Sequence, residues 1–179
     1  APTGTAHGER KWAPVAPLTE TKELVYSDPK VRQPSWSRYY SGTSETRDRE
    51  LSYALDVGLE VLGGGMTSRL YQSLVEDQQI AINANTYAWT TLHDEGPAII
   101  TASPAPGVTL DVLEAAIMAE VEKVLEEGFT DAEVERARNS LAAQAIYARD
   151  SQSNMANTFG STLALGGSIE DVLDYPDAM

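Results

Sequence analysis

Apolar side chains recur at helical spacing in the first third of the chain. Leucines fall on one face of residues 47–62, which predicts an amphipathic helix there. Residues 63–65 are all glycine and end this helix, because glycine is a poor helix former. A second, shorter helix is expected from about Thr67, with Leu70 and Leu74 on one side.

Extended segments flank this helical region on both sides. Lys22–Ser27 is expected to form a strand, and residues 31–43 a second extended stretch. Pro34 lies inside that stretch and indicates an edge position or a bulge, because proline cannot donate a ladder hydrogen bond. Residues 80–92 and 97–103 are rich in β-forming side chains and flank a turn, which predicts a hairpin.

The second half of the chain is expected to be mainly helical. Thr109 can cap a helix that Gly128 ends. Thr130 and Glu133 match the capping-box pattern of the next helix, and Phe129 stands where a hydrophobic staple would be. Two further helices are indicated by Met155, Phe159 and Leu163 and by a start at Ser168. Strands and helices are thus partly segregated, so the predicted fold class is α+β, an antiparallel sheet with helices packed on one side.

The first 21 residues differ from the rest in composition. Prolines interrupt them, Ala, Thr and Gly are frequent, and Trp12 is the one large apolar anchor. We therefore divide the chain into a linker, residues 1–21, and one domain, residues 22–179.

Charge is distributed unevenly along the 179 residues. The chain has 13 basic and 27 acidic side chains, a net charge of −14. Residues 1–49 have 8 basic and 6 acidic side chains, a net of +2, which leaves −16 for the remainder. Such a field repels phosphate backbones and anionic lipids, so we expect no nucleic-acid partner. Two interpretations of the acidic charge stay open. It could attract a basic peptide, or the acidic helices could serve only to keep the protein soluble.

Membrane insertion and cysteine chemistry are not expected. No apolar run approaches the roughly 20 residues that span a bilayer. The chain has no cysteine, which removes disulfides, thiol nucleophiles and cysteine-ligated zinc.

The histidines do not form a catalytic pattern. His7 and His93 are the only two, and the zinc motifs H-x-x-E-H and H-E-x-x-H are absent. His93 stands beside Asp94 and Glu95, where a solvated turn is favoured over a weak cation site. The serine motif G-x-S-x-G is also absent, so we predict no catalytic residue and no metal ligand.

Two features suit a peptide ligand. The glycine run offers backbone groups and close approach, so Gly64 and Gly65, with Met66 beside them, are candidate substrate-binding residues. A tight helix–helix turn is the alternative interpretation of the same run. The second feature is one face of the strand in residues 80–92, which can line a peptide groove or face solvent. Its members are Ala81, Asn83, Asn85, Tyr87 and Trp89.

Several stretches together resemble the M16 family of zinc metallopeptidases, which includes pitrilysin, insulin-degrading enzyme and mitochondrial processing peptidase. The resemblance covers residues 20–179 and is closest to the bacterial two-domain branch. It rests on motifs in one order: LEVLGGGMTSRLYQSLVEDQQIA, then HDEGPAIITASPAPGVTL, then the helix junction EEGFTDAEVERARNSL. In this family, homologous α+β domains close around an unfolded peptide. One domain has H-x-x-E-H and zinc, and its metal-free partner helps to hold the substrate.

The resemblance implies a non-catalytic domain, C-terminal in type, that encloses an extended peptide for hydrolysis elsewhere. Zinc is then expected in a missing catalytic M16 domain, in the same polypeptide or a separate subunit, and this chain alone should be inactive. A bacterial, periplasmic or otherwise exported location and a possible dimer are also implied. Two alternatives stay open: a degenerate M16-like scaffold or assembly subunit without proteolytic activity, and a stand-alone α+β binding module.

This sequence departs from the family pattern at two places. Partner domains often have an arginine after the glycine loop and a tyrosine seven residues later, and these positions are Val75 and Ile82 here. Neither side chain can donate a hydrogen bond or stabilise an oxyanion. Family domains also continue with another helix and strand, so the domain is expected to be truncated at its C-terminus.

Overall fold

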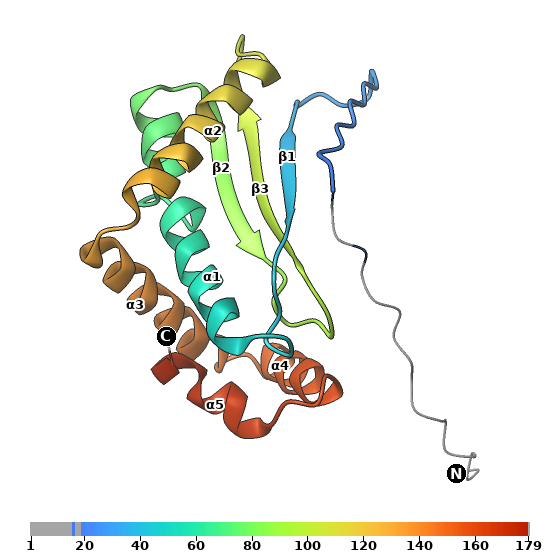
Figure 1. Ribbon diagram of the computed structural model, residues 1–179, viewed down its shortest axis with the longest axis vertical. Helices are drawn as coiled ribbons and strands as arrows, with labels where there is room; N and C mark the ends of the chain where they lie inside the picture. Colours follow the sequence, from blue (N-terminus) through green and yellow to red (C-terminus); the bar gives the residue numbers. More distant parts are fainter. Residues whose placement is uncertain (1–15, 17–18, 179) are drawn as a thin grey trace, which may run out of the picture.

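The computed structural model describes residue 16 and residues 19–178 (Figure 1). Most of the expected linker, including Trp12, lies outside these residues, as does His7. The division of the chain at residues 21 and 22 therefore stays a prediction.

The sheet consists of three antiparallel strands in the order β1-β3-β2. Their bounds are β1 Trp36–Ser41, β2 Ala81–Ala88 and β3 Pro97–Pro104. The strands β2 and β3 form the predicted hairpin. Because β3 is central, β1 lies at an edge, as the position of Pro34 indicated.

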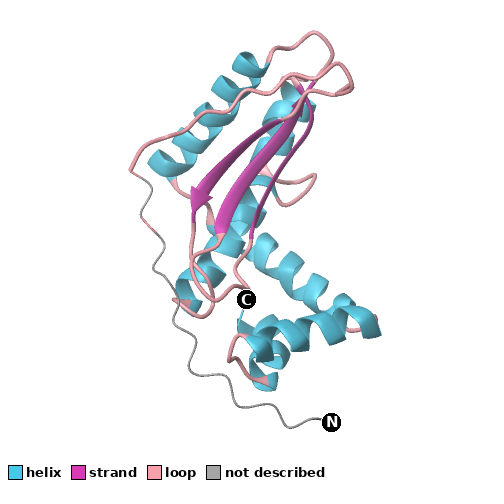
Figure 2. Cartoon of the chain, turned by 90° about the vertical axis from the view of Figure 1, so that its right-hand side faces the viewer, coloured by secondary structure: helices cyan, strands magenta, loops and turns pink. Residues whose placement is uncertain are grey.

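The helices lie beside and below this sheet (Figures 1 and 2). Their bounds are α1 Arg49–Gly63, the π-helix η1 Tyr71–Asp77, α2 Leu110–Glu127, α3 Asp131–Ala148, α4 Gln152–Ala164 and α5 Ile169–Ala178. The helices α1 and α2 cover one face of the sheet, which confirms the predicted α+β class. The helices α4 and α5 form a hairpin at one end of the sheet.

The core lies between the sheet and these helices. Leu70 and Leu74, which the helical pattern placed on one side of a helix, have no exposed surface. They pack with Leu113 and Ile117 of α2 and with Ile100 of β3. Burial of such side chains stabilises the fold by about 1.5–3 kcal/mol each.

Caps define the two longest helices. The side chain of Thr109 accepts a hydrogen bond from the amide of Val112 at the start of α2. The capping box at the start of α3 is present in full, between Thr130 and Glu133. The ring of Phe129 packs over α1, because a Cβ added at Gly58 would lie 3.4 Å from it.

The strand predicted at Lys22–Ser27 is wrong. This segment is extended but forms no ladder, and Leu24, Val25 and Tyr26 are 92%, 78% and 77% exposed. Its hydrogen bonds are local, such as that from Tyr26 to Asp28. The side chains favour a strand, but a strand also needs a neighbour that pairs with its backbone.

Candidate functional site

Each glycine of residues 63–65 meets a different demand of the fold. A Cβ at Gly63 would lie 2.7 Å from the backbone nitrogen of Thr86, so glycine lets α1 approach β2. A Cβ at Gly64 would lie 2.6 Å from the Cα of Glu60. Gly65 has a φ of +143° and open space around it. The fold thus explains the whole run, and the substrate contact of Gly64 and Gly65 stays a prediction.

Three backbone groups of this turn are already hydrogen-bonded within the chain. The Gly64 amide donates to the carbonyl of Glu60 at 2.9 Å. The Gly65 carbonyl accepts from the hydroxyl of Ser68 at 2.6 Å, and Gln72 donates to the Met66 carbonyl at 2.6 Å. Within residue 16 and residues 19–178, the amides of Gly65 and Met66 have no acceptor. The turn therefore presents two adjacent N–H donors.

A surface hollow of about 270 Å³ adjoins these donors. Its lining includes Gly64, Gly65 and Met66 from the turn, Glu60 of α1, and Ser140 and Arg136 of α3. Ser140 donates to Glu60 Oε1 at 2.8 Å, which fixes that carboxylate in the floor. The Met66 side chain is 71% exposed at the rim. The turn and its two amides therefore border an open hollow at the surface.

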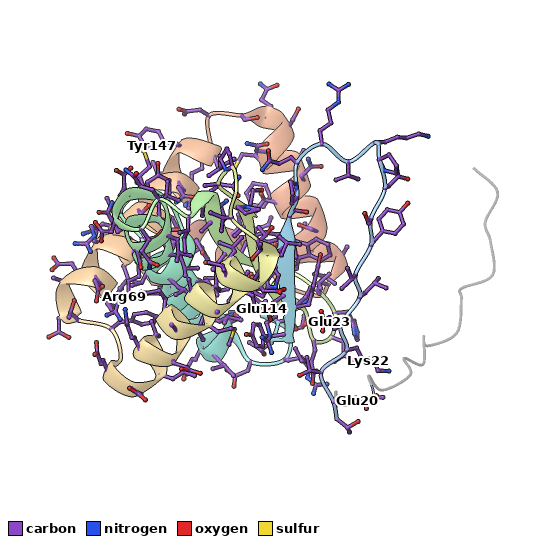
Figure 3. All side chains as sticks on the ribbon, turned by 90° about the horizontal axis from the view of Figure 1, so that it is seen from above. Glu20, Lys22, Glu23, Arg69, Glu114 and Tyr147 are labelled. Atoms are coloured by element: carbon purple, nitrogen blue, oxygen red, sulfur yellow. The ribbon has the colours of Figure 1, made fainter. Side chains whose placement is uncertain are left out.

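Arg69 anchors the turn to the start of α3. Its Nε and Nη2 donate to the two carboxylate oxygens of Glu133, each at 2.8 Å, and Nη2 also donates to the Gly128 carbonyl at 3.0 Å. The guanidinium lies 5.3 Å from the centre of the Phe129 ring. Figure 3 shows Arg69 on the side of the molecule formed by α2 and α3. The hydrogen bonds from Arg69 lower the pKa of Glu133 to about 2, and this engaged arginine has a structural role.

The sequence placed five residues from Ala81 to Trp89 on one face of a strand, and the structure confirms this for only part of the set. Asn85, Tyr87 and Trp89 are exposed, whereas Ala81 is buried, so the prediction for Ala81 is wrong. The β2–β3 register shifts between Ala81 and Asn83, and this irregularity moves Ala81 onto the core face.

The two positions that differ from the M16 pattern show no polar function. Val75 packs against the core, and Ile82 is half exposed at the irregularity in β2. Both side chains are aliphatic, so neither has a charge or a group that could donate a hydrogen bond to a substrate.

A second cavity, which the sequence did not indicate, lies under the α4–α5 hairpin. It measures about 690 Å³ and is bounded by α1, the β2–β3 loop, the end of α3, α4 and α5. Asp56 and Glu45 face it. Burial, followed by repulsion from Glu45, raises the pKa of Asp56 to about 6. One feature of the sequence could have pointed to this cavity. Asp56 is an acidic residue between Leu55 and Val57 on a largely apolar helix.

Metal ligands are not gathered in the part of the chain that the structure describes. No group of three His, Cys, Asp or Glu side chains there can hold a metal ion. Across the same residues, no helix is long and apolar enough to cross a membrane.

Curated relatives and a family model match most of this domain. The model described as the peptidase M16 inactive domain matches residues 5–141. An uncharacterised zinc protease of Streptomyces coelicolor is 30% identical over 130 residues, 71% of this chain and 28% of the relative. The zinc protease PqqE of Helicobacter pylori is 30% identical over 122 residues, 68% of this chain and 27% of the relative. The chain thus spans just over a quarter of the length of these relatives.

Solved structures share the fold. A protease from Helicobacter pylori superposes with a TM-score of 0.73 at 24% identity, over 84% of this chain and 36% of the other. The inactive peptidase domain of a putative zinc protease from Bordetella parapertussis gives 0.69 at 20% identity, over 82% and 75% of the two chains. The family model, which covers more than half of the residues, shows that the chain belongs to the peptidase M16 family, as an inactive domain.

Proposed function

We propose that this domain is the non-catalytic half of a zinc metalloendopeptidase. It encloses and holds an extended peptide, and a separate M16 domain with H-x-x-E-H and zinc hydrolyses that peptide. The match to the inactive M16 domain and the likeness to zinc proteases support this assignment. The catalytic domain is in the same polypeptide or in a partner subunit.

The observation that carries the holding role is the pair of amide donors at Gly65 and Met66. An extended peptide presents a carbonyl acceptor at each residue, and backbone donors bind such carbonyls whatever the side chains are. The hollow beside the donors leaves room for the peptide. Backbone recognition of this kind gives affinity with little sequence preference.

A matched pair of substitutions tests the role of the Met66 amide in the full-length protease, or in this chain combined with its catalytic subunit. Met66→Ala removes the side chain and keeps the N–H, whereas Met66→Pro also removes the donor. We expect a roughly tenfold lower kcat/KM for Met66→Pro than for Met66→Ala, as one hydrogen bond is lost. Melting temperatures of both variants control for folding. Equal turnover at equal stability in the two variants would contradict the proposal.

The second candidate function is a scaffold or assembly subunit without turnover. The apolar residues at Val75 and Ile82 favour it, because they remove side chains that could assist hydrolysis. The coding sequence upstream of Ala1 and a peptide-cleavage assay separate the two functions. An upstream H-x-x-E-H with turnover supports the protease, and a full-length protein without either supports the scaffold.

A further inference from the structure

The α4–α5 hairpin, residues 152–178, has a limited attachment to the rest of the domain. Its extensive contacts with the body are those between α5 and α3, and α4 packs mainly on α5. None of its described residues is fully buried. Figure 2 shows the hairpin projecting from the lower end of the sheet. A turn at Arg149–Ser151 connects it to α3 and is the natural hinge.

Three polar or aromatic contacts close the hairpin onto the body. Arg49 donates to Asp171 at 2.7 Å, which joins the start of α1 to α5. Arg149 donates to the carbonyl of Leu173 at 2.7 Å. The rings of Tyr53 and Tyr175 meet edge to face with centroids 5.3 Å apart. Water can replace the two hydrogen bonds, and none of the residues in these contacts belongs to the main core cluster, so the hairpin can open without disrupting that core.

Two carboxyl groups lie in the cavity beneath the closed hairpin. Asp56 accepts only a long hydrogen bond from Thr90, at 3.5 Å, and Glu45 accepts one from Thr91 at 3.3 Å. Within the described residues, neither carboxylate forms an ion pair with a basic side chain. Closure therefore removes these acids from water without supplying a counter-ion.

Charged and titratable groups from several elements lie at or near the cavity. The cavity itself is lined by Asp56 of α1, Glu45 of the preceding loop, Arg149 at the end of α3, and Asp171 and Tyr175 of α5. Arg49 of α1 and His93 and Asp94 of the β2–β3 loop line an adjoining hollow, and Tyr53 and Glu60 of α1 act electrostatically on Tyr175. The helix α4 has no ionisable side chain. The basic groups Arg49 and Arg149 are engaged with Asp171 and the Leu173 carbonyl. Asp56 is thus the acid that gains least compensation when the hairpin closes.

We propose that the α4–α5 hairpin is a pH-sensitive flap that closes over the cavity when the Asp56 carboxyl is protonated and loosens when that carboxyl is ionised. The closed state holds the proton more tightly, because burial and the neighbouring Glu45 disfavour the charge. With the hairpin open, Asp56 is solvated and its pKa returns towards the ordinary value near 3.9.

The sign of the effect follows from these two states. The pKa of Asp56 is raised to about 6 in the closed state, so closure is strongest below about pH 4 and weakens as the pH rises through 6. A difference of about two pKa units corresponds to roughly a hundredfold change in the closing equilibrium. Partial access of solvent reduces this, and we expect a tenfold to hundredfold change.

Hydrogen exchange of the whole chain at several pH values tests the flap. After correction for the intrinsic exchange rates, protection of α4 and α5 should fall severalfold, up to about tenfold, relative to α2 between pH 5 and 7.5. Asp56→Asn imitates the protonated acid and should keep the protection at pH 7.5 close to its acid value. Glu50→Gln, which removes an exposed acid of the same helix, is the matched control and should retain the full fall.

Glu45→Gln provides a second variant that keeps the proposal falsifiable if Asp56→Asn fails to fold. Removal of the neighbouring charge should move the midpoint of the transition to lower pH. An unchanged midpoint in Glu45→Gln, or a full pH dependence in a folded Asp56→Asn, would assign the effect to another group and overturn the proposal. Equal protection of the wild-type hairpin at pH 5 and 7.5 would also overturn it.

Discussion

The ion pair between Arg69 and Glu133 joins two parts of the domain that are far apart in sequence. Arg69 follows the glycine turn, and Glu133 belongs to the first turn of α3. We predict that this pair is among the strongest polar contacts of the chain. The perturbations are Arg69→Met and Glu133→Gln, singly and together, because both replacements preserve most of the side-chain volume.

The magnitude can be worked out in two ways. The pKa of Glu133 is lowered from about 4.5 to about 2, chiefly by Arg69, and 2.5 pKa units correspond to roughly 3 kcal/mol. Breaking a buried pair costs about 3–5 kcal/mol, and this pair is slightly exposed, with side chains 19% and 17% accessible. Solvent screening lowers both figures, so we expect each single substitution to cost about 2–3 kcal/mol.

Urea unfolding of the four proteins at pH 7 gives the coupling energy directly. We expect about 1.5–2.5 kcal/mol, on the same estimate of partial screening. The exposed pair between Arg47 and Asp94 is the matched control, and its coupling should stay below about 0.5 kcal/mol. A coupling at Arg69 and Glu133 no larger than in this control would refute the reasoning.

The same pair determines part of the acid sensitivity. Because the pKa of Glu133 is lowered in the folded state, its stabilisation is present above about pH 4.5 and is lost as the pH falls towards 2. Glu133→Gln should therefore remove this part of the decrease in unfolding free energy at low pH. Asp56 acts with the opposite sign and mainly between pH 4 and 6, so the two contributions are separable.

Three further predictions concern single sites or the whole chain. Thr130→Ala removes the cap of α3 and should cost about 1 kcal/mol in the urea midpoint analysis; an unchanged midpoint would show that the cap is dispensable. Leu70→Ala should cost about 2–5 kcal/mol, against less than about 0.5 kcal/mol for Leu125→Ala, whose side chain is 79% exposed. The chelator-washed chain should contain no stoichiometric zinc and cleave no peptide, and elemental analysis with a peptidase assay checks both.

Local chemistry made the helices predictable. The capping box at Thr130 and Glu133 lies within four residues, so the sequence alone located the start of α3. Helical spacing placed Leu70 and Leu74 on one side of a helix, and both side chains on that side are buried. The fold class followed from the order of such elements.

Features that depend on distant partners were not predictable. The segment Lys22–Ser27 has strand-forming side chains, but pairing requires a neighbour that no local pattern encodes. The irregularity after Ala81 changes the face of one residue without changing the composition of the strand. Arg69 and Glu133 are 64 positions apart, and the cavity at Asp56 is built from six segments. At the glycine turn, no local pattern shows which backbone amides are left without an acceptor.

The strand order has a consequence for handling the isolated domain. Within the described residues, β1 and β2 each pair on one side only, so each presents an edge that can template pairing with another molecule. The apolar side chains of Leu24, Val25 and Tyr26 stand exposed on the segment that precedes β1. Mutual repulsion at a net charge of −14 opposes such aggregation at neutral pH, and it vanishes near the isoelectric point of about 4.4. Acid titrations therefore require micromolar concentrations, whereas purification at pH 7 to 8 and low salt keeps the edges apart.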